Sequence, residues 1–296
     1  MIGLTDEQLI QELKDRFTEN KQSLEELRKL TKQLKEVNIK LEESEALKSH
    51  FISNITNEIV NPFTSIIGLS KSILKLNGSQ WPKVQNMVQL IASEAFNLDF
   101  QLKNIFAAAK IEAGEIAPEI VKTNITSIIE SVIDNFTIEA EKKNIKIKYT
   151  GQAGDKTANH FNTDPEKFKL IISNLLNNAL NFSYKENSID IGTSIDNGVL
   201  YVTVKDYGAG ISEEDQEKIY DRFKRLDNGI NSINRGHGLG LSITKAYLDL
   251  LKGKIEVFSA VGKGAAFTIS LTENPEQIEG YATDDNEFIF DNSEIF

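Results

Sequence analysis

Three segments of this 296-residue chain contain the residue types that a nucleotide site needs. They are an asparagine-rich helix, an Asp followed by spaced glycines, and a glycine-rich turn before another helix. Their residues are Asn174, Asn178 and Asn181; Asp206, Gly208 and Gly210; and Gly236, Gly238 and Gly240. One pair of glycines is a weak signal, because many turns need a residue that tolerates positive φ. Three such elements in order predict a pocket for a nucleoside triphosphate and its metal ion.

Each segment suits a different part of such a ligand. Asn178 offers a neutral oxygen to Mg²⁺, which prefers oxygen ligands and keeps several waters. Asn174 lies one turn earlier on the same helix face. Asp206 ends a predicted strand, where its carboxylate can accept a hydrogen bond from an exocyclic amine such as that of adenine. The glycines that precede the helix near Leu241 leave bare backbone amides, which form a natural phosphate site. The plain alternatives are ordinary helix asparagines and turn residues.

The segment between the two glycine-rich turns, residues 221–235, is rich in charge and poor in apolar anchors. We expect it to be a mobile lid over the nucleotide. Four of its cations could meet phosphate charge, although each is as readily a solvated surface residue. They are Arg222, Lys224, Arg225 and Arg235.

Composition limits the classes of partner and compartment. The net charge of −11 makes a phosphate backbone a poor partner, so we expect no nucleic acid. No apolar stretch is long enough for a membrane span and no signal-peptide pattern is present. With no cysteine, disulfides are excluded, which fits a cytoplasmic location. Residues 273–296 hold eight carboxylates and no Lys or Arg. This tail is expected to be disordered, although its aromatic residues could dock on a basic partner surface.

The N-terminal residues predict a long helix. Residues 4–48 lack proline, and Leu27, Leu34 and Leu41 recur at seven-residue spacing. Polar residues share the seam, as in a parallel dimeric coiled coil whose polar core positions determine the register. The alternative is a solvated amphipathic helix packed on its own domain. We assign residues 1–48 to a coiled-coil signalling helix.

Residues 49–115 predict a helical hairpin. An apolar stripe continues through residues 49–76, with Pro62 inside it as a bend point. Trp81 and Pro82 begin a second helix, which we expect over residues 83–113 and to end at Gly114. Two antiparallel helices with one broad apolar face each make half of a four-helix bundle. A hairpin alone cannot bury both faces, so we expect a homodimer.

Residues 119–272 have an α+β pattern. Helices are expected at 124–141, 165–181 and 239–252, and strands at 145–149, 189–195, 199–205, 254–259 and 265–271. Helices and antiparallel strands in separate runs predict an α/β sandwich. The last region, 273–296, is the acidic tail.

Together these motifs resemble the catalytic core of sensor histidine kinases over residues 45–272. The C-terminal part resembles the ATP-binding domain of the gyrase, Hsp90, histidine kinase and MutL class. Asn174–Ser183 resembles its N box, Asp206–Ile211 and Gly236–Ser242 its two glycine boxes, and Ile219–Arg225 its F box. Asn181 departs from the Lys that the family usually has, and the loss of that cation would weaken nucleotide binding.

The resemblance implies the cofactors ATP and Mg²⁺, with Asn178 as the magnesium ligand. The implied ATP-binding residues are Asn174, Asn178, Asn181, Asp206, Gly208, Gly210, Ile211, Phe223, Arg235, Gly236, Gly238, Leu239 and Gly240.

The hairpin motif, residues 51–62, resembles the phosphoacceptor helix of the family with one departure. The family has a His immediately before the Glu, and this chain has Asn57 before Glu58. An amide nitrogen has no free lone pair, so Asn57 cannot form a phosphoramidate. Glu58 and Asn61 are retained and could support phosphatase activity or docking, or be surface residues only. His50 lies about 10 Å along the helix axis from residue 57, too far to replace it.

The leading hypothesis is therefore a cytoplasmic, homodimeric histidine-kinase core that binds Mg-ATP but does not autophosphorylate at residue 57. It would act through conformation, docking, or phosphatase activity toward a response regulator receiver domain. An upstream sensor would signal through the coiled coil. Two alternatives stay open. One is an active kinase with an engineered substitution at Asn57. The other is a non-catalytic dimeric adaptor with a relic nucleotide domain.

Overall fold

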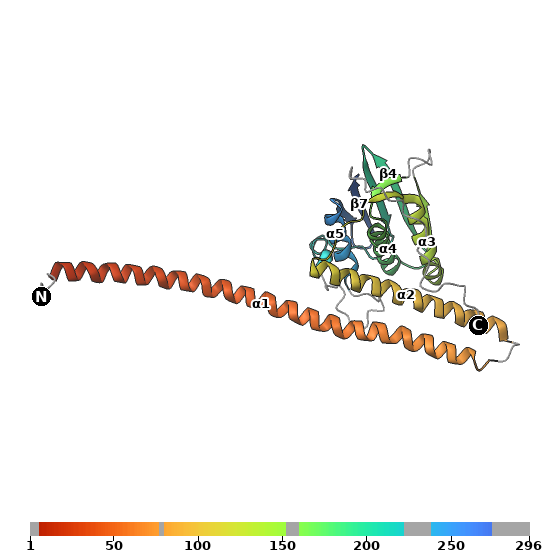
Figure 1. Ribbon diagram of the computed structural model, residues 1–296, viewed down its shortest axis with the longest axis horizontal. Helices are drawn as coiled ribbons and strands as arrows, with labels where there is room; N and C mark the ends of the chain where they lie inside the picture. Colours follow the sequence, from red (N-terminus) through yellow and green to blue (C-terminus); the bar gives the residue numbers. More distant parts are fainter. Residues whose placement is uncertain (1–5, 77–79, 152–159, 222–237, 274–296) are drawn as a thin grey trace. The chain divides into compact units, whose positions relative to one another are not determined.

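The computed structural model describes residues 6–76, 80–151, 160–221 and 238–273 of the chain (Figure 1). The chain divides into two compact units, Met1–Ser53 and Asn54–Phe296. The predicted lid segment and the acidic tail lie outside the described residues, except for Asp221 and Glu273 at their edges. None of the described helices is long and apolar enough to cross a membrane.

The first helix is longer than any other described element. Helix α1 runs from Asp6 to Ile73 and continues through Pro62, which is buried. Its apolar positions at Leu27, Leu34 and Leu41 are more than half exposed in the single chain. The continuous helix agrees with the predicted run of helical sequence over residues 4–76.

Helix α2, Trp81–Ala113, begins and ends as its sequence predicts. A proline stands in its first turn, where the missing N–H is not needed. Gly114 ends it in the left-handed conformation at φ 70°, and its backbone N–H donates to the carbonyl oxygen of Ile111. Phe96 of α2 meets Phe136 of the following helix, α3 (Ile125–Lys142), edge to face, with ring centroids 5.0 Å apart.

The C-terminal region is a mixed sheet covered by helices. Its helices are α3 (Ile125–Lys142), α4 (Pro165–Phe182) and α5 (Gly240–Leu250). Its strands are β1 (Val121–Asn124), β2 (Lys146–Thr150), β3 (His160–Thr163), β4 (Ser188–Asp196), β5 (Val199–Lys205), β6 (Lys254–Ser259) and β7 (Ala265–Thr272). Within the described residues, five strands pair in the order β2-β4-β5-β7-β6. This confirms the predicted α+β class.

The expectation of purely antiparallel strands was wrong in one place. Strand β2 pairs with β4 in parallel, with Ile147 opposite Ile189, while the other pairs of the large sheet are antiparallel. Helix α4 lies between these strands in the chain, and a helical crossover returns the backbone in the same direction. The short pair β1–β3 was not predicted, because four-residue strands carry too little alternation.

The core lies between one face of the sheet and the three helices, which gather on the same side in Figure 1. Along β5, Leu200, Val202 and Val204 are buried, while Tyr201 and Lys205 are exposed. This alternation is what a sheet with one solvated face requires. Helix α4 is the most buried of the described helices, and five of its residues have no exposed surface: Phe168, Ile171, Ile172, Leu175 and Leu176.

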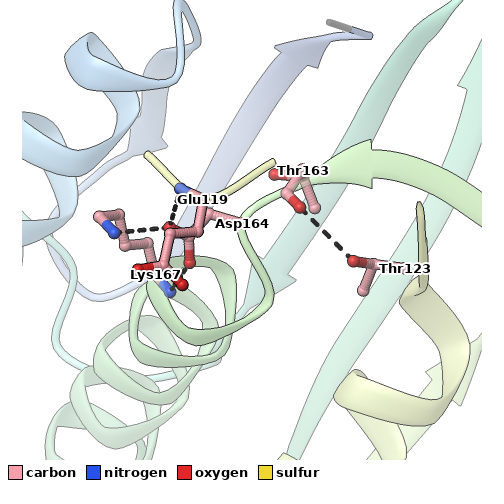
Figure 2. A network of polar contacts seen from close by, with 5 residues as sticks. All are labelled: Glu119, Thr123, Thr163, Asp164 and Lys167. Carbon is pink, nitrogen blue, oxygen red and sulfur yellow. Dashed lines mark hydrogen bonds and ion pairs between the residues drawn. The ribbon is translucent and has the colours of Figure 1, made fainter. Parts of the chain in front are cut away.

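A polar network holds the beginning of α4 (Figure 2). Asp164 caps this helix and is 2% exposed. Its Oδ1 accepts from the backbone N–H of Lys167 at 2.9 Å, and its Oδ2 accepts from the backbone N–H of Glu119 at 2.9 Å. The Lys167 ammonium pairs with the same Oδ2 at 2.5 Å. The segment that enters the α+β region is therefore tied to the N-terminus of α4.

We expect Asp164→Ala to lower the free energy of unfolding by ~3 kcal/mol, because it removes a cap and leaves a buried N–H and an ammonium without their acceptor. The matched control is Asn124→Ala, which removes the exposed cap of α3, whose Oδ1 accepts from Ser127 at 3.1 Å. This control should lose only ~1 kcal/mol. Urea denaturation of both variants measures the difference. Equal losses would contradict the role of the buried network.

Candidate nucleotide-binding site

Helix α4 carries the polar stripe of the site. Asn174, Asn178 and Asn181 follow one another at four- and three-residue spacing, which places them on one helix face. Asn174 is 2% exposed, and its Nδ2 is buried without a hydrogen-bond partner. Asn178 and Asn181 are half-buried. A buried donor without a partner is uncommon in folded proteins and often belongs to a functional site.

The first glycine turn lies against the end of α4. Ser183 and Gly208 form an isolated antiparallel bridge, and the backbone N–H of Ala209 donates to the Phe182 carbonyl oxygen at 3.2 Å. A Cβ on Gly208 would lie 1.8 Å from that oxygen. Only glycine permits this approach, which places Asp206 beside the asparagine helix.

The same turn is held on its other side by the connection between β6 and β7. Gly210 has φ 68°, and a Cβ there would lie 2.0 Å from the carbonyl oxygen of Ala260. The Ile211 N–H donates to Ser259 Oγ at 2.8 Å. Gly264, at φ 79°, lies against the Asp206 carbonyl oxygen, which a Cβ would approach to 2.2 Å. Gly264 belongs to none of the motifs seen in the sequence, although a glycine between two predicted strands was the available signal.

The beginning of α5 forms the third side. Leu239 is 2% exposed at the N-cap, and Gly238 before it has φ 67°. A Cβ on Gly240 would lie 3.3 Å from Asn174 Oδ1, so this helix start and α4 are close neighbours. Ser242 Oγ donates to the Leu239 carbonyl oxygen at 2.9 Å. No side chain among the described residues caps the first backbone N–H groups of α5. Free amides at the positive end of a helix suit a phosphate.

Asp206 is the buried carboxylate of the site, at 4% exposure. Its Oδ1 accepts from the Gly208 N–H at 2.9 Å. Burial raises the pKa of Asp206 above its ordinary value, and the backbone N–H groups of Gly208 and Ala265 oppose that rise. Among the described residues no Lys or Arg forms an ion pair with it. A desolvated carboxylate of this kind is a strong acceptor for a neutral donor.

The structure thus brings together the predicted residues of α4, the first glycine turn and the start of α5. Other predicted residues lie outside the described ones: Phe223, Arg235 and Gly236, with the lid residues around them. Asn57, Glu58 and Asn61 all lie in α1, where Asn61 is exposed and the side chains of the other two are not described. Lys143 was missed altogether. Its ammonium contacts Asn181 Oδ1 at 3.2 Å, and no motif spacing links residues 38 apart in sequence.

Comparisons with known proteins agree with this geometry. Residues 163–275 match the family of histidine kinase-, DNA gyrase B- and HSP90-like ATPases. The circadian input-output histidine kinase CikA of Synechocystis sp. is 29% identical over 262 residues, which are 86% of this chain and 34% of that protein. The signal transduction histidine-protein kinase BarA of Escherichia coli is 27% identical over 277 residues, 88% of this chain and 30% of that protein. The chain therefore spans about a third of the length of these relatives.

A solved structure supports the fold. Full-length ShkA, crystallised in complex with AMPPNP, covers 75% of this chain with a TM-score of 0.52 and 21% identity. The match takes in 45% of that longer chain.

We expect Gly208→Ala to disrupt the site, because its Cβ cannot fit against the Phe182 carbonyl oxygen. The variant should lose ~2 kcal/mol or more of unfolding free energy, as overpacking does. Gly192→Ala is the matched control, since nothing lies within 4 Å of a Cβ there. Chemical denaturation and nucleotide titration of both variants check this. If Gly208→Ala kept the stability and the nucleotide affinity of the unaltered chain, the turn would not be held against α4.

We expect Asp206→Asn to stabilise the fold at neutral pH while weakening adenine recognition. A raised carboxyl pKa means that the group favours folding most below its unfolded value of 3.8 and loses that contribution as pH rises through the folded value. The gain in the free energy of unfolding of the variant should therefore be seen at pH 7 and become smaller toward pH 4.

The affinity of Asp206→Asn for an adenine nucleotide should fall, although its stability rises. Asn Oδ1 can keep the Gly208 N–H, but Nδ2 then faces the donor amine of adenine, so binding should fall about tenfold, or ~1.4 kcal/mol. Urea denaturation at two pH values and titration with an adenine nucleotide measure the two effects. A variant that loses stability at pH 7 would contradict the burial argument.

Proposed function

We propose that this chain, which carries the catalytic core of a sensor histidine kinase, binds Mg-ATP and does not autophosphorylate at the usual position. It acts instead through conformation, partner docking, or phosphatase activity toward a response regulator. The proposal of nucleotide binding rests on one observation. Asn174, Asp206, Gly208 and Gly240 lie around one candidate site. These residues come from three elements that the sequence separates.

The residues present fit a nucleotide with its metal ion. The unpartnered Nδ2 of Asn174 is a donor that needs an acceptor. Gly240 leaves room beside it that a larger side chain would fill. Asn178 would hold Mg²⁺ through its neutral Oδ1, and the ion would supply charge neutralisation of the phosphates. Asp206 would accept the exocyclic amine of adenine, and the first amides of α5 would donate to phosphate oxygens.

ShkA, the structural neighbour with AMPPNP, makes a triphosphate analogue a reasonable ligand for the shared fold. The charge of the lid segment, with Arg235 and its neighbours, supports the same ligand class. Phe223 and Gly236 are proposed to complete the site with Ile211 and Leu239.

Asn57 separates ATP binding from phosphate transfer. Autophosphorylation needs a ring nitrogen with a free lone pair, and the lone pair of an amide nitrogen is delocalised into its carbonyl. Asn57 therefore cannot take the γ-phosphate. Glu58 and Asn61 follow in the same helix, and Asn61 is exposed. A carboxylate and an amide near one another can orient water, which is the chemistry that dephosphorylation of a receiver domain needs.

We further propose a homodimer that receives its signal through the first helix. In the single chain, apolar side chains are at least half exposed at the coiled-coil positions and also on both hairpin helices. They are Leu27, Leu34 and Leu41; Val60, Phe63 and Ile67; and Trp81 and Phe106. Pairing with a second copy would cover these stripes. An upstream sensor would then act on the coiled coil, in the cytoplasm.

The test uses labelling with ATP that carries a labelled γ-phosphate, on this chain and on Asn57→His side by side. Beforehand, titration should show that the unaltered chain binds Mg-ATP at millimolar concentration or below. We expect acid-labile phosphate on Asn57→His only, because the nucleotide site is intact and residue 57 alone lacks the nucleophile.

The outcomes separate the alternatives. Label on the unaltered chain would overturn the proposal that Asn57 silences it. Binding without label on either protein would place the defect beyond residue 57. Absence of Mg-ATP binding would favour the adaptor with a relic nucleotide domain.

A further inference from the structure

Lys143 links the end of α3 to the end of α4. Its ammonium donates to the Leu180 carbonyl oxygen at 2.7 Å and to Asn181 Oδ1 at 3.2 Å. The first contact satisfies a carbonyl in the last turn of α4, which has no basic residue of its own there. The second contact reaches the last side chain of the asparagine stripe. Lys143 therefore stands beside the nucleotide site without belonging to any motif of it.

The contact determines which way the Asn181 amide points. An ammonium group has only donors, so it must face Oδ1 rather than Nδ2. Nδ2 is turned the other way, and among the described residues it donates to no protein atom. Asn181 shares its helix face with Asn174 and Asn178. The two N–H groups of Asn181 are thus free to donate to a ligand on that face.

The charge of Lys143 is only partly neutralised by the protein. The residue is half-buried, and burial lowers the pKa of its ammonium; Glu139 opposes this effect and Lys185 adds to it. Glu139 forms its ion pair with Lys142 instead, at 3.1 Å. Within the described residues, Lys143 has no carboxylate at ion-pair distance. A half-buried cation held by neutral oxygens is complementary to an anionic ligand.

A lysine from another helix therefore places a cation next to residue 181.

We propose that Lys143 is a positioning residue of the nucleotide site, which holds Oδ1 of Asn181 so that Nδ2 donates to the phosphate chain of the nucleotide. The inference rests on the proposed function and adds a residue to that site. The pair presents a short amide donor backed by an ammonium. Because the phosphates receive both the N–H group and the nearby charge, the pair should favour ATP over ligands without phosphate.

The experiment compares the affinities of the full chain for Mg-ATP and for adenosine, by calorimetric or fluorescence titration. Lys143→Met should weaken ATP binding about tenfold, while adenosine affinity changes less than about twofold. Lys142→Met is the matched control, because it removes the same charge one residue away, where the ammonium pairs with Glu139. It should leave both affinities unchanged.

Two further variants keep the test decisive if Lys143→Met folds poorly. Asn181→Asp keeps the contact with Lys143 but presents only acceptors, so it should lower ATP affinity more than adenosine affinity. The double variant Lys143→Met with Asn181→Lys places the cation on α4 and should restore the preference for ATP. Lys143→Arg keeps a charged donor, so its affinities for ATP and adenosine should stay close to those of the unaltered chain.

A role in helix capping alone would give a different result. Loss of the Leu180 contact would lower thermal stability and reduce both affinities by the same factor. An unchanged ratio of ATP to adenosine affinity in Lys143→Met and Asn181→Asp would overturn the inference while leaving the proposed function standing. Failure of the unaltered chain to bind Mg-ATP would overturn both.

Discussion

The Phe182 carbonyl oxygen accepts a hydrogen bond from the backbone of the first glycine turn, and the nucleotide site depends on this contact. It places the buried Asp206 near the end of α4, the helix that carries Asn174. The approach is so close that Gly208 has no room for a side chain. Backbone contacts of this kind are short and rigid, so the ligand-facing groups are positioned before any ligand arrives.

Helix α4 holds its asparagine side chains in place because both of its ends are hydrogen-bonded to other segments. Asp164 binds the first turn to the entering segment at Glu119, and Lys143 binds the last turn to α3. Between these ends, the apolar face packs against the sheet with side chains such as Ile171 that have no exposed surface. A helix held at both ends and along one side presents its remaining face, the asparagine stripe, in one orientation.

The position proposed for the phosphoacceptor belongs to a different part of the chain. Asn57 lies in α1, whereas the contacts that build the nucleotide site come from residues 143–265. None of the described contacts that build that site comes from α1. The proposed loss of the phosphoacceptor is therefore compatible with intact glycine turns.

The sequence by itself determined most of the elements and predicted the residues of a candidate site. Periodicity located α2, α4 and β5 to within two residues at either end. The residue types predicted ligand-facing roles for Asn178, Asp206 and Gly240. Tertiary structure alone decided three things. The parallel pairing of β2 with β4 follows from a crossover that alternation does not encode. The role of Gly264 depends on the Asp206 backbone lying against it. The contact of Lys143 with Asn181 joins residues 38 apart, which only the packing of two helices brings together.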